Sequence, residues 1–323
     1  MGVLRGGASS EHEVSLRSGH AILRNLPEDR YSARDIYIDK QGVWHEHGVP
    51  TSLDRVLPTI DVAVLPLHGE GGQDGEIQKV LERYGVPYTG ASSFAAFTAS
   101  HKLLAKEKAA AAGLLTPKYR FIQPEDDAEA VTMDIIRNFA QPVVVKPVRW
   151  GSSVGVSIVG GYAPVHQAIA ALLPHSGGVL VEELIRGTEA TVGVVDHIRG
   201  ETVYALPPIE ILPPPDQEFF NYEAKYSGAT REICPGNFTK SVSEELMQMA
   251  RTMHTALEQR HYSRSDFIVS PRGIYYLETN TAAAVGMTEQ SLFPVALSAV
   301  GIKFPDFLSH VVELALGRTP SVI

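Results

Sequence analysis

The chain carries Val143-Val144-Val145-Lys146-Pro147 and, shortly after it, Gly151-Ser152-Ser153-Val154-Gly155. An apolar strand here delivers a lysine to a loop of small residues, whose backbone N–H groups can approach an anion closely. The serine hydroxyls and the lysine ammonium add further donors, so the loop suits a triphosphate. A tight hairpin would show the same pattern, and the GK[ST] ending of a Walker loop is missing.

Short β-branched runs alternate with helical patterns on both sides of this loop. Before it, a strand at 61–65 and helices at 14–26 and 74–84 predict a parallel sheet wrapped by helices, and Ser10 and Glu13 have the spacing of a capping box. Beyond residue 90 we expect strands at 143–145, 179–185, 190–196, 203–212, 265–270 and 274–278, and helices at 102–112, 124–140 and 243–260. The expected fold class is α/β, or α+β overall.

Length and charge narrow the class of protein. The chain has 323 residues, which at roughly 150 residues per domain predicts two domains, or three small ones. A net charge of −9 argues against a nucleic acid or an anionic membrane as the main partner. The single cysteine, Cys234, cannot form an intrachain disulfide, and the residues after Met1 do not form a signal-peptide core. We therefore expect a cytoplasmic protein with no membrane segment.

Asp266, Glu278 and Asn280 lie on two predicted strands joined by a hairpin turn at 271–273. Adjacent antiparallel strands can bring these oxygen ligands together, and Mg²⁺ prefers oxygen ligands and nucleotide phosphates. Glu278 and Asn280 are two residues apart, which puts both on one face of a strand. Carboxylates at strand ends are often simply solvated, so the metal hypothesis depends on a phosphate site beside them.

Three glutamates, Glu182, Glu183 and Glu189, flank a turn that follows an apolar strand. They could accept hydrogen bonds from an adenine amino group and from ribose hydroxyls, although a solvated strand edge would look similar. Two glycine-rich loops, at 6–15 and 67–75, precede helices, and in an open α/β sheet such loops converge on the ligand crevice. A lone histidine such as His68 is more often structural than catalytic, but its place in one of these loops favours a site.

The motifs together resemble a known family. The runs GGASSEHEVSLRSG, LPLHGEGGQDGEIQ, VVVKPVRWGSSVGV, VLVEELIRGTE, EAKY and SRSDFIV…YYLETNT…GMTEQSL occur in this order across nearly the whole chain and closely resemble D-alanine-D-alanine ligases of the ATP-grasp superfamily. The resemblance implies an ATP-grasp fold with an N-terminal Rossmann-like domain at 1–92, a central lid domain at 93–183 and a C-terminal domain at 184–323. It also implies a homodimer.

The implied activity is the joining of two D-alanines with ATP for peptidoglycan synthesis, with two Mg²⁺ ions for which Mn²⁺ could substitute. Lys102 and Lys146 match lysines that contact ATP phosphates, Glu182 matches the adenine acceptor and Glu189 the ribose acceptor. The remaining residues of the implied nucleotide site are Ser152, Ser153, Glu183, Leu184, Ile185 and Lys225. The matched metal ligands are Asp266, Glu278 and Asn280.

The site for the first amino acid is implied by the same resemblance. Glu11 matches the acid that holds the first D-alanine's ammonium, and His68 matches a histidine near the substrates. Ser152 and Tyr226 match residues that hydrogen-bond with that glutamate and close a loop over the site. The carboxylate of this D-alanine would attack the γ-phosphate, giving an acyl phosphate and ADP.

The site for the second amino acid follows. Arg264 and the backbone of Gly286 match the oxyanion-stabilising pair, and Ser291 with Leu292 match the second D-alanine's carboxylate site. The chain departs from the family here: residues 280–288 read NTAAAVGMT where the family reads Asn-Thr-x-Pro-Gly-Met-Thr. Two alternatives stay open, namely a ligase that joins D-alanine to D-lactate or D-serine, and an ATP-grasp protein that binds nucleotide but has lost ligation.

Overall fold

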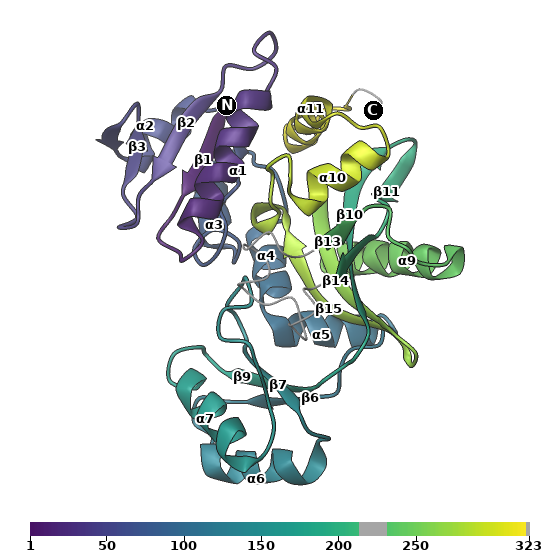
Figure 1. Ribbon diagram of the computed structural model, residues 1–323. Helices are drawn as coiled ribbons and strands as arrows, with labels where there is room; N and C mark the ends of the chain where they lie inside the picture. Colours follow the sequence, from purple (N-terminus) through teal and green to yellow (C-terminus); the bar gives the residue numbers. More distant parts are fainter. Residues whose placement is uncertain (213–230, 321–323) are drawn as a thin grey trace.

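The computed structural model describes residues 1–212 and 231–320. Its first sheet has the order β4-β3-β2-β1-β5, with β1 (Gly2–Gly6) parallel to β2 (Arg34–Ile38) and to β5 (Ala63–Val64), and with β3 (Trp44–Glu46) and β4 (Val49–Thr51) antiparallel at the edge. Helices α1 (His12–Asn25), α2 (Leu53–Val56) and α3 (Glu76–Tyr84) connect these strands. Figure 1 shows this part in purple and blue. The expected parallel sheet with helices is confirmed here.

The predicted capping box at the start of α1 is wrong. The helix begins at His12, and the residue before it, Glu11, caps it without a side-chain hydrogen bond. Ser9 takes the polar role in this turn instead, because its hydroxyl donates to the His68 carbonyl (2.7 Å) and accepts from the Glu11 N–H (3.2 Å). The turn is therefore tied to the 67–75 loop, which leaves the Glu11 side chain for other contacts.

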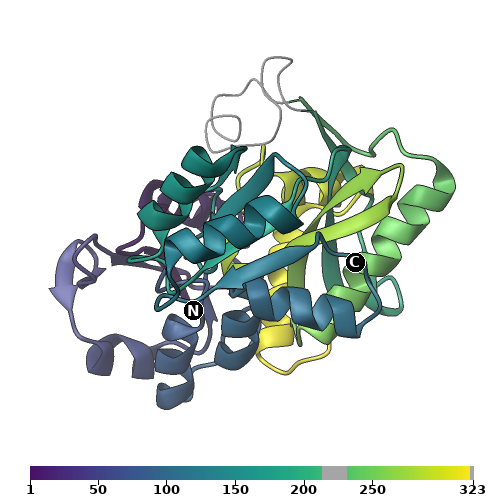
Figure 2. The same cartoon turned by 90° about the horizontal axis from the view of Figure 1, so that it is seen from below.

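The second sheet lies at the bottom of Figure 1 and is antiparallel throughout. Its order is β6 (Tyr119–Ile122), β9 (Val179–Glu183), β7 (Val143–Pro147) and β8 (Ser157–Val159). Helices α6 (Ala128–Asn138) and α7 (Tyr162–Leu172) pack side by side on it, which Figure 2 shows from below. They enclose a core of their own, with Ile135 and Val165 fully buried. The 151–155 loop joins two neighbouring strands, so it is part of a hairpin connection.

The third sheet has the order β13-β12-β10-β14-β15, with β11 paired to β10. Its strands are β10 (Thr188–Ile198), β11 (Glu201–Ala205), β12 (Ile209–Leu212), β13 (Arg231–Ile233), β14 (Tyr262–Ser270) and β15 (Gly273–Thr281), and α9 (Lys240–Ala256) packs against it. The single strand expected at 203–212 is wrong. Pro207 and Pro208 have no backbone N–H to donate, and the chain leaves the ladder there.

Two further helices, α4 (Ser93–Ser100) and α5 (Lys102–Ala111), pack against β15 of the third sheet. Ala99, Ala105 and Ala109 lie in the same hydrophobic cluster as residues of β10 and α9. The expected division at residue 93 groups these helices with the second sheet, and their packing against residues of the third sheet makes them the contact between the two parts. The consequence is that α5 connects the two sheets on either side of the site described below.

The first and third sheets share a core. Val3 and Ile22 cluster with Phe293 of α10 (Leu292–Ala299) and Phe307 of α11 (Phe304–Ala315). Across the described residues no single helix is long and apolar enough to cross a membrane; α10 and α11 reach that length and composition only together, and they are bent by 104°. The shared core therefore joins the part of the chain that carries the 6–15 and 67–75 loops to the sheet that carries β14 and β15.

Candidate active site

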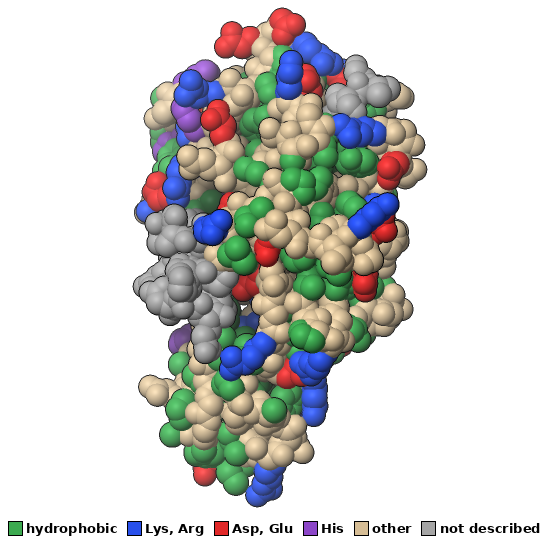
Figure 3. Space-filling model, turned by 45° about the vertical axis from the view of Figure 1, so that its right-hand side comes forward, with side chains coloured by type: hydrophobic (Ala, Val, Ile, Leu, Met, Phe, Trp, Pro, Cys, Tyr) green, Lys and Arg blue, Asp and Glu red, His purple; other side chains and the backbone are tan. Residues whose placement is uncertain are grey.

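A cavity of about 410 Å³ lies between the second and third sheets. In the space-filling view of Figure 3, a hollow with acidic and basic side chains sets off the lobe at the bottom from the rest of the surface. Most of the residues expected to bind nucleotide line the cavity: Lys102, Lys146, Ser153, Glu182, Glu183, Leu184, Ile185 and Glu189. Arg264, Asp266, Glu278 and Leu292 line it as well. Side chains from four distant parts of the sequence therefore meet in one pocket.

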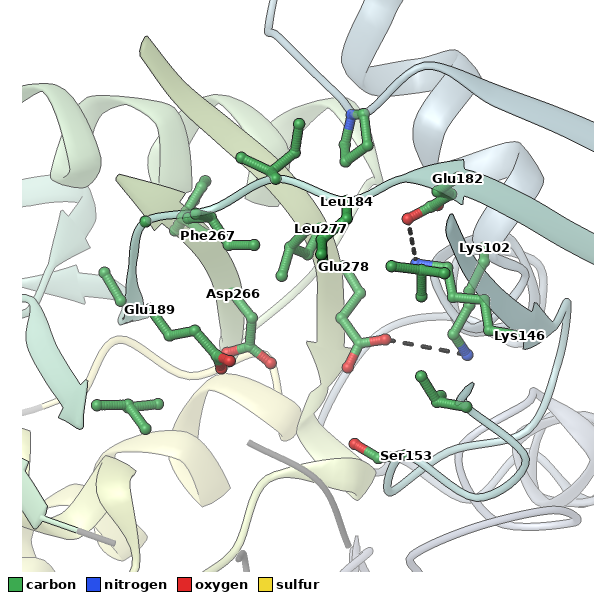
Figure 4. Close-up of a pocket in the computed structure, with 18 of the residues that line it drawn as sticks. Lys102, Lys146, Ser153, Glu182, Leu184, Glu189, Asp266, Phe267, Leu277 and Glu278 are labelled. Carbon is green, nitrogen blue, oxygen red and sulfur yellow. Dashed lines mark ion pairs between the residues drawn. The ribbon is translucent and has the colours of Figure 1, made fainter. Parts of the chain in front are cut away.

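One end of this cavity is apolar. Val144 and Ile158 of the second sheet face it together with Phe267 and Leu277 of the third. These flat aliphatic and aromatic walls suit a planar heterocycle, and the polar groups at the margin would set its orientation. Figure 4 shows Leu184, Leu277 and Phe267 in the upper part of the cavity, with Glu189 and Asp266 on the left and Glu182, Lys102 and Lys146 on the right.

The charged side chains are arranged in ion pairs, which Figure 4 marks with dashed lines. Lys146 Nζ lies 2.9 Å from Glu182 Oε2, and Lys102 Nζ lies 3.9 Å from Glu278 Oε2. Lys102 also donates to the Trp150 carbonyl (2.5 Å), so it holds the start of the 151–155 loop. Although burial raises it, the neighbouring lysines hold the pKa of Glu182 below its usual value. This glutamate is therefore an anion and a hydrogen-bond acceptor.

The 151–155 loop contacts the N-terminal part of the chain. Ser152 donates a hydrogen bond to Glu11 Oε1. The φ angles of Ser152 and Ser153 are 49° and 59°, a conformation that few non-glycine residues adopt and that constrained sites often contain. A Cβ at Gly151 would lie 3.1 Å from Glu11 Oε2 and 2.9 Å from Gln73 Nε2. The glycine thus allows the loop to approach the acid.

The expected partners Tyr226 and Lys225 lie outside the described residues.

The three expected metal ligands lie beside one another on the β14–β15 hairpin. Asp266 is paired with Glu278 in the ladder, and Arg264 with Asn280. Asp266 accepts two hydrogen bonds from Arg264 (both 3.1 Å), one from Asn280 Nδ2 (2.9 Å) and one from Thr191 Oγ1 (2.5 Å). A β-bulge between Asp266 and Phe267 shifts the register by one residue, so that Asp266 lies opposite Glu278 rather than Leu277. Among the described residues no three His, Cys, Asp or Glu side chains form a cluster suited to a metal, so the third oxygen here is an amide.

His68 is buried and faces the turn at residues 282–285. Its Nε2 lies 3.1 Å from Ser18 Oγ, and the Met287 N–H donates to the same hydroxyl (3.3 Å). Burial, and then the charge of Arg264, lower the pKa of His68 to about 4. The imidazole is therefore neutral at pH 7, and it connects α1 to the turn before Gly286.

Acidification below pH 6.5 should destabilise the fold through two buried histidines. His261 accepts a hydrogen bond from the Gly90 N–H at Nδ1 (2.9 Å), and burial, with the nearby Arg260 charge, lowers its pKa to about 4, the same value as for His68. The unfolded chain, with a histidine pKa near 6.5, binds more protons between pH 6.5 and 4, so stability is full above this window and is lost as the pH falls through it. Urea unfolding at pH 7 and pH 5 should differ by about 2 kcal/mol for each histidine.

His68→Gln and His261→Gln should each flatten that pH dependence, whereas replacing the exposed His20 by glutamine should leave it unchanged. An identical slope in all three variants would contradict the assignment.

Two functional candidates were missed in the sequence. Lys106 is fully buried, with its Nζ 2.9 Å from Glu182 Oε1. Its spacing of four residues from Lys102 puts both lysines on one face of α5, a signal that could have drawn attention to it. Thr191, which donates to Asp266, is an unremarkable threonine in a strand, and nothing in the sequence distinguishes it.

Comparison with known proteins agrees with the family resemblance found in the sequence. The family described as D-ala D-ala ligase C-terminus matches residues 109–313, and the one described as D-ala D-ala ligase N-terminus matches residues 1–55. The chain belongs to the D-alanine-D-alanine ligase family. The D-alanine--D-alanine ligase of Syntrophobacter fumaroxidans is 39% identical over 97% of this chain and 96% of its own length. That of Geobacter sulfurreducens is 38% identical over 96% and 92%.

Solved structures of ligases have the same overall fold. The VanG D-Ala:D-Ser ligase from Enterococcus faecalis gives a TM-score of 0.86 at 26% identity, over 97% of this chain and 98% of that one. The D-alanine-D-alanine ligase from Coxiella burnetii gives 0.83 at 26% identity, over 98% and 94%. The ATP-grasp fold expected from the motifs is confirmed.

This member of the D-alanine-D-alanine ligase family departs from the family motif at two further positions, and each holds a polar side chain. His101, where the family has an aspartate, precedes α5, and its ring nitrogen accepts from the Leu104 N–H at 3.5 Å as an N-cap. Gln73, where the family has a glutamate, accepts from the Gly69 N–H at 3.2 Å. Both side chains thus accept a backbone hydrogen bond, which an aspartate or glutamate can also do.

The longer turn of this family member is buried. Residues 282–284 form a short 3-10 helix, Ala282 lies in the core shared by the first and third sheets, and Ala283 packs within the first sheet's core. The chain then reaches Gly286, where a Cβ would lie 2.8 Å from Ser291 Oγ. Ser291 Oγ also accepts a hydrogen bond from the Thr288 N–H (3.1 Å) and lies 2.8 Å from the Thr288 hydroxyl oxygen.

Gly286→Ala should raise the KM for D-alanine about 10-fold or more, because the new methyl group displaces Ser291 from its contacts with Thr288. Steady-state kinetics at saturating ATP measures this, and the KM for ATP should be unchanged. Gly160→Ala is the matched control, since its Cβ would meet other atoms at 3.6 Å or more. Equal effects of the two substitutions would count against a special role for Gly286.

Proposed function

We propose that this chain joins two D-alanine molecules into D-alanyl-D-alanine, converting ATP to ADP and phosphate, and so supplies a peptidoglycan precursor. The observation that carries the proposal is the cavity in which two lysines, an arginine and the β14–β15 carboxylates face an apolar slot. The full-length similarity to D-alanine--D-alanine ligases agrees with it.

ATP would lie in this cavity with its adenine in the apolar end. Glu182 would accept the exocyclic amino group, and Glu189 the ribose hydroxyls, while residues 183–185 pass along the base. Lys102 and Lys146 would contact the phosphates, since both ammonium groups reach the cavity. Ser153 and the backbone of its loop would add donors to the terminal phosphate, and Lys225 would join the same site.

The β14–β15 carboxylates fit a divalent cation, because Asp266, Glu278 and Asn280 present oxygen atoms from adjacent positions, which is the donor chemistry that Mg²⁺ prefers. We propose that these three residues hold two Mg²⁺ ions, with Mn²⁺ able to substitute. Bound there, the metal would offset the charge on the transferred phosphoryl group. Arg264, which pairs with Asp266 in this structure, would then be available to a substrate oxygen.

In the first step, Glu11 would hold the ammonium of the first D-alanine. Ser152 would keep the Glu11 carboxylate oriented through its hydrogen bond to Oε1, and Tyr226 would join the Ser152–Glu11 pair. The substrate carboxylate oxygen then attacks the γ-phosphorus, the bond to the β-phosphate oxygen breaks, and an acyl phosphate and ADP result. Because rigid groups hold the two reactants in place, the entropy cost of bringing them together is met on binding and not in the chemical step.

In the second step, the deprotonated amine of the second D-alanine attacks the acyl carbon. Ser291 and the Leu292 backbone at the start of α10 would hold its carboxylate at a helix N-terminus. Arg264 and the Gly286 N–H would stabilise the tetrahedral oxyanion before phosphate leaves. His68, neutral and buried, would position the turn that carries Gly286.

The proposal is tested by D-alanine-dependent phosphate release from ATP in the presence and absence of Mg²⁺. Release that requires both supports ligation, and ATP binding without it would favour a nucleotide-binding protein that has lost ligation. A second candidate comes from the fold's similarity to a D-Ala:D-Ser ligase. Product mass after mixing D-alanine with D-serine or D-lactate separates these specificities. Relatives at 35–39% identity named for the dipeptide reaction favour D-alanine at both positions.

We further propose a three-part organisation at 1–92, 93–183 and 184–323, a homodimer, and a cytoplasmic location. The negative net charge is consistent with small-molecule substrates rather than a nucleic acid or a membrane as partner. Light scattering of the purified protein tests the oligomeric state, because a dimer doubles the mass expected for the 35.1 kDa chain.

A further inference from the structure

A buried lysine behind the cavity has no part in the roles assigned above. Lys106 lies on α5 with 0% of its surface exposed, and it is absent from the cavity lining. Its Nζ is 2.9 Å from Glu182 Oε1 and also donates to Thr116 Oγ1 and to the Pro117 carbonyl (3.4 Å). All three of these oxygens belong to the protein, so the ammonium is surrounded by protein partners. Lys106 is therefore committed to the protein and does not reach a nucleotide.

Glu182 lies between two cations. Lys106 pairs with one of its carboxylate oxygens and Lys146 with the other, each at 2.9 Å. Burial lowers the pKa of Lys106 to about 8, so it is still mostly protonated at pH 7, and the cluster carries one more positive than negative charge. Burying this excess is costly, and an apolar side chain on α5 would avoid the cost. The stability of the fold alone does not account for the lysine.

The ion pair also crosses between two layers. Lys106 belongs to α5, which packs against β15 of the third sheet, while Glu182 belongs to β9 of the second. Thr116 and Pro117 lie in the connection from α5 to β6. One ammonium therefore holds the glutamate, the connection and the helix together at the wall of the cavity, where Figure 4 shows Glu182 also paired with a second lysine.

We propose that Lys106 is a positioning residue for base recognition: it retains Glu182 as an ionised acceptor for the adenine amino group while Lys146 turns to the phosphates. This inference rests on the proposed function. When Lys146 leaves Glu182 for the triphosphate, a carboxylate with no other partner would be buried and uncompensated. With Lys106 in place the remaining pair is neutral, and the carboxylate still has lone pairs to accept an amino hydrogen.

The test is nucleotide selectivity. Inosine triphosphate (ITP) has a carbonyl where adenine has its amino group, so an ionised Glu182 accepts from ATP and repels ITP. We expect Lys106→Met to lower the preference for ATP over ITP about tenfold or more, because the anion that discriminates the bases is no longer held. Binding is measured by calorimetry with each nucleotide alone, and the ratio of kcat/KM values gives a second readout.

A matched control and a second background show whether Lys106 acts through Glu182. Lys108→Met, at an exposed lysine on the same helix, should leave the ATP preference unchanged. In a Glu182→Gln background, Lys106→Met should change the ATP preference by less than about twofold, because a neutral amide needs no counter-ion. Lys106→Gln, which removes the charge but keeps a donor, replaces Lys106→Met if the latter does not fold.

An unchanged ATP preference in the Lys106 variants, or an equal loss in both backgrounds, overturns the inference even if the variants melt at lower temperature. Calorimetry separates this result from a failure of the proposed function. A protein that binds ATP selectively through Lys106 but releases no D-alanine-dependent phosphate retains the inference and loses the ligase assignment.

Discussion

Arg264→Met should lower turnover by about 10²–10³ while changing the affinity for ATP by no more than a few-fold, because the substitution removes the donor that we propose acts on the charge developing in the second step. Arg264 is half-buried in the cavity wall, where its guanidinium makes two hydrogen bonds to Asp266. Asp266 retains its hydrogen bonds from Asn280 and Thr191 in the variant, so it is not left without donors. The measurement is kcat at saturating D-alanine and Mg²⁺, with ATP binding determined separately.

The control for this substitution is Arg251→Met on α9, where the guanidinium donates to Gln248 Oε1 on the same helix. It should leave turnover unchanged. If Arg264→Met instead lowered the melting temperature but preserved turnover per folded molecule, Arg264 would be a structural arginine and the oxyanion role would be refuted.

Asp266→Asn should reduce turnover by about 10³ at physiological Mg²⁺, because the substitution removes a carboxylate charge from the proposed metal site. A bound metal ion typically lowers the barrier by several kcal/mol. It also leaves Arg264 without its ion-pair partner. A titration with Mg²⁺ should show a higher half-saturation concentration, and EDTA should abolish D-alanine-dependent phosphate release by the unmodified protein.

The matched control is Asp29→Asn, at an exposed aspartate remote from the β14–β15 hairpin. Its Mg²⁺ titration should superimpose on that of the unmodified protein. An Asp266→Asn protein with unaltered turnover and the same Mg²⁺ requirement would show that Asp266 serves only to hold Arg264.

Local features of the fold were predictable where the controlling contacts are close in sequence. The short turn sets the register of the β14–β15 hairpin as far as Phe267 opposite Tyr276, and a β-bulge next to Phe267 then places Asp266 opposite Glu278. The helices at 74–84 and 102–112 were expected from composition and end signals, and α3 and α5 occupy nearly these residues. The expected strand at 203–212 was wrong because that prediction rested on the apolar residues of the segment. Pro207 and Pro208, which cannot donate to a strand ladder, already indicate the break in the sequence.

Contacts between distant segments were not predictable in the same way. Ser18, His68 and Met287 form one hydrogen-bonded group, although 269 residues separate the first from the last. Nothing local to any of them indicates the other two. The capping box failed for a related reason, since the turn before α1 is held by Ser9 and the carbonyl of His68 rather than by its own helix.

The order of the motifs along the chain is a property of the sequence, and it was enough to identify the family and to suggest which lysines and carboxylates form its site. The pairing of Lys106 with Glu182 is a property of the folded molecule, because it requires α5 to pack on the third sheet while β9 runs through the second. A buried charge is stabilised only by what surrounds it in three dimensions. The spacing of residues along the chain therefore indicated the candidate site residues, and the tertiary structure decided which of them lie together and which side chains hold them in place.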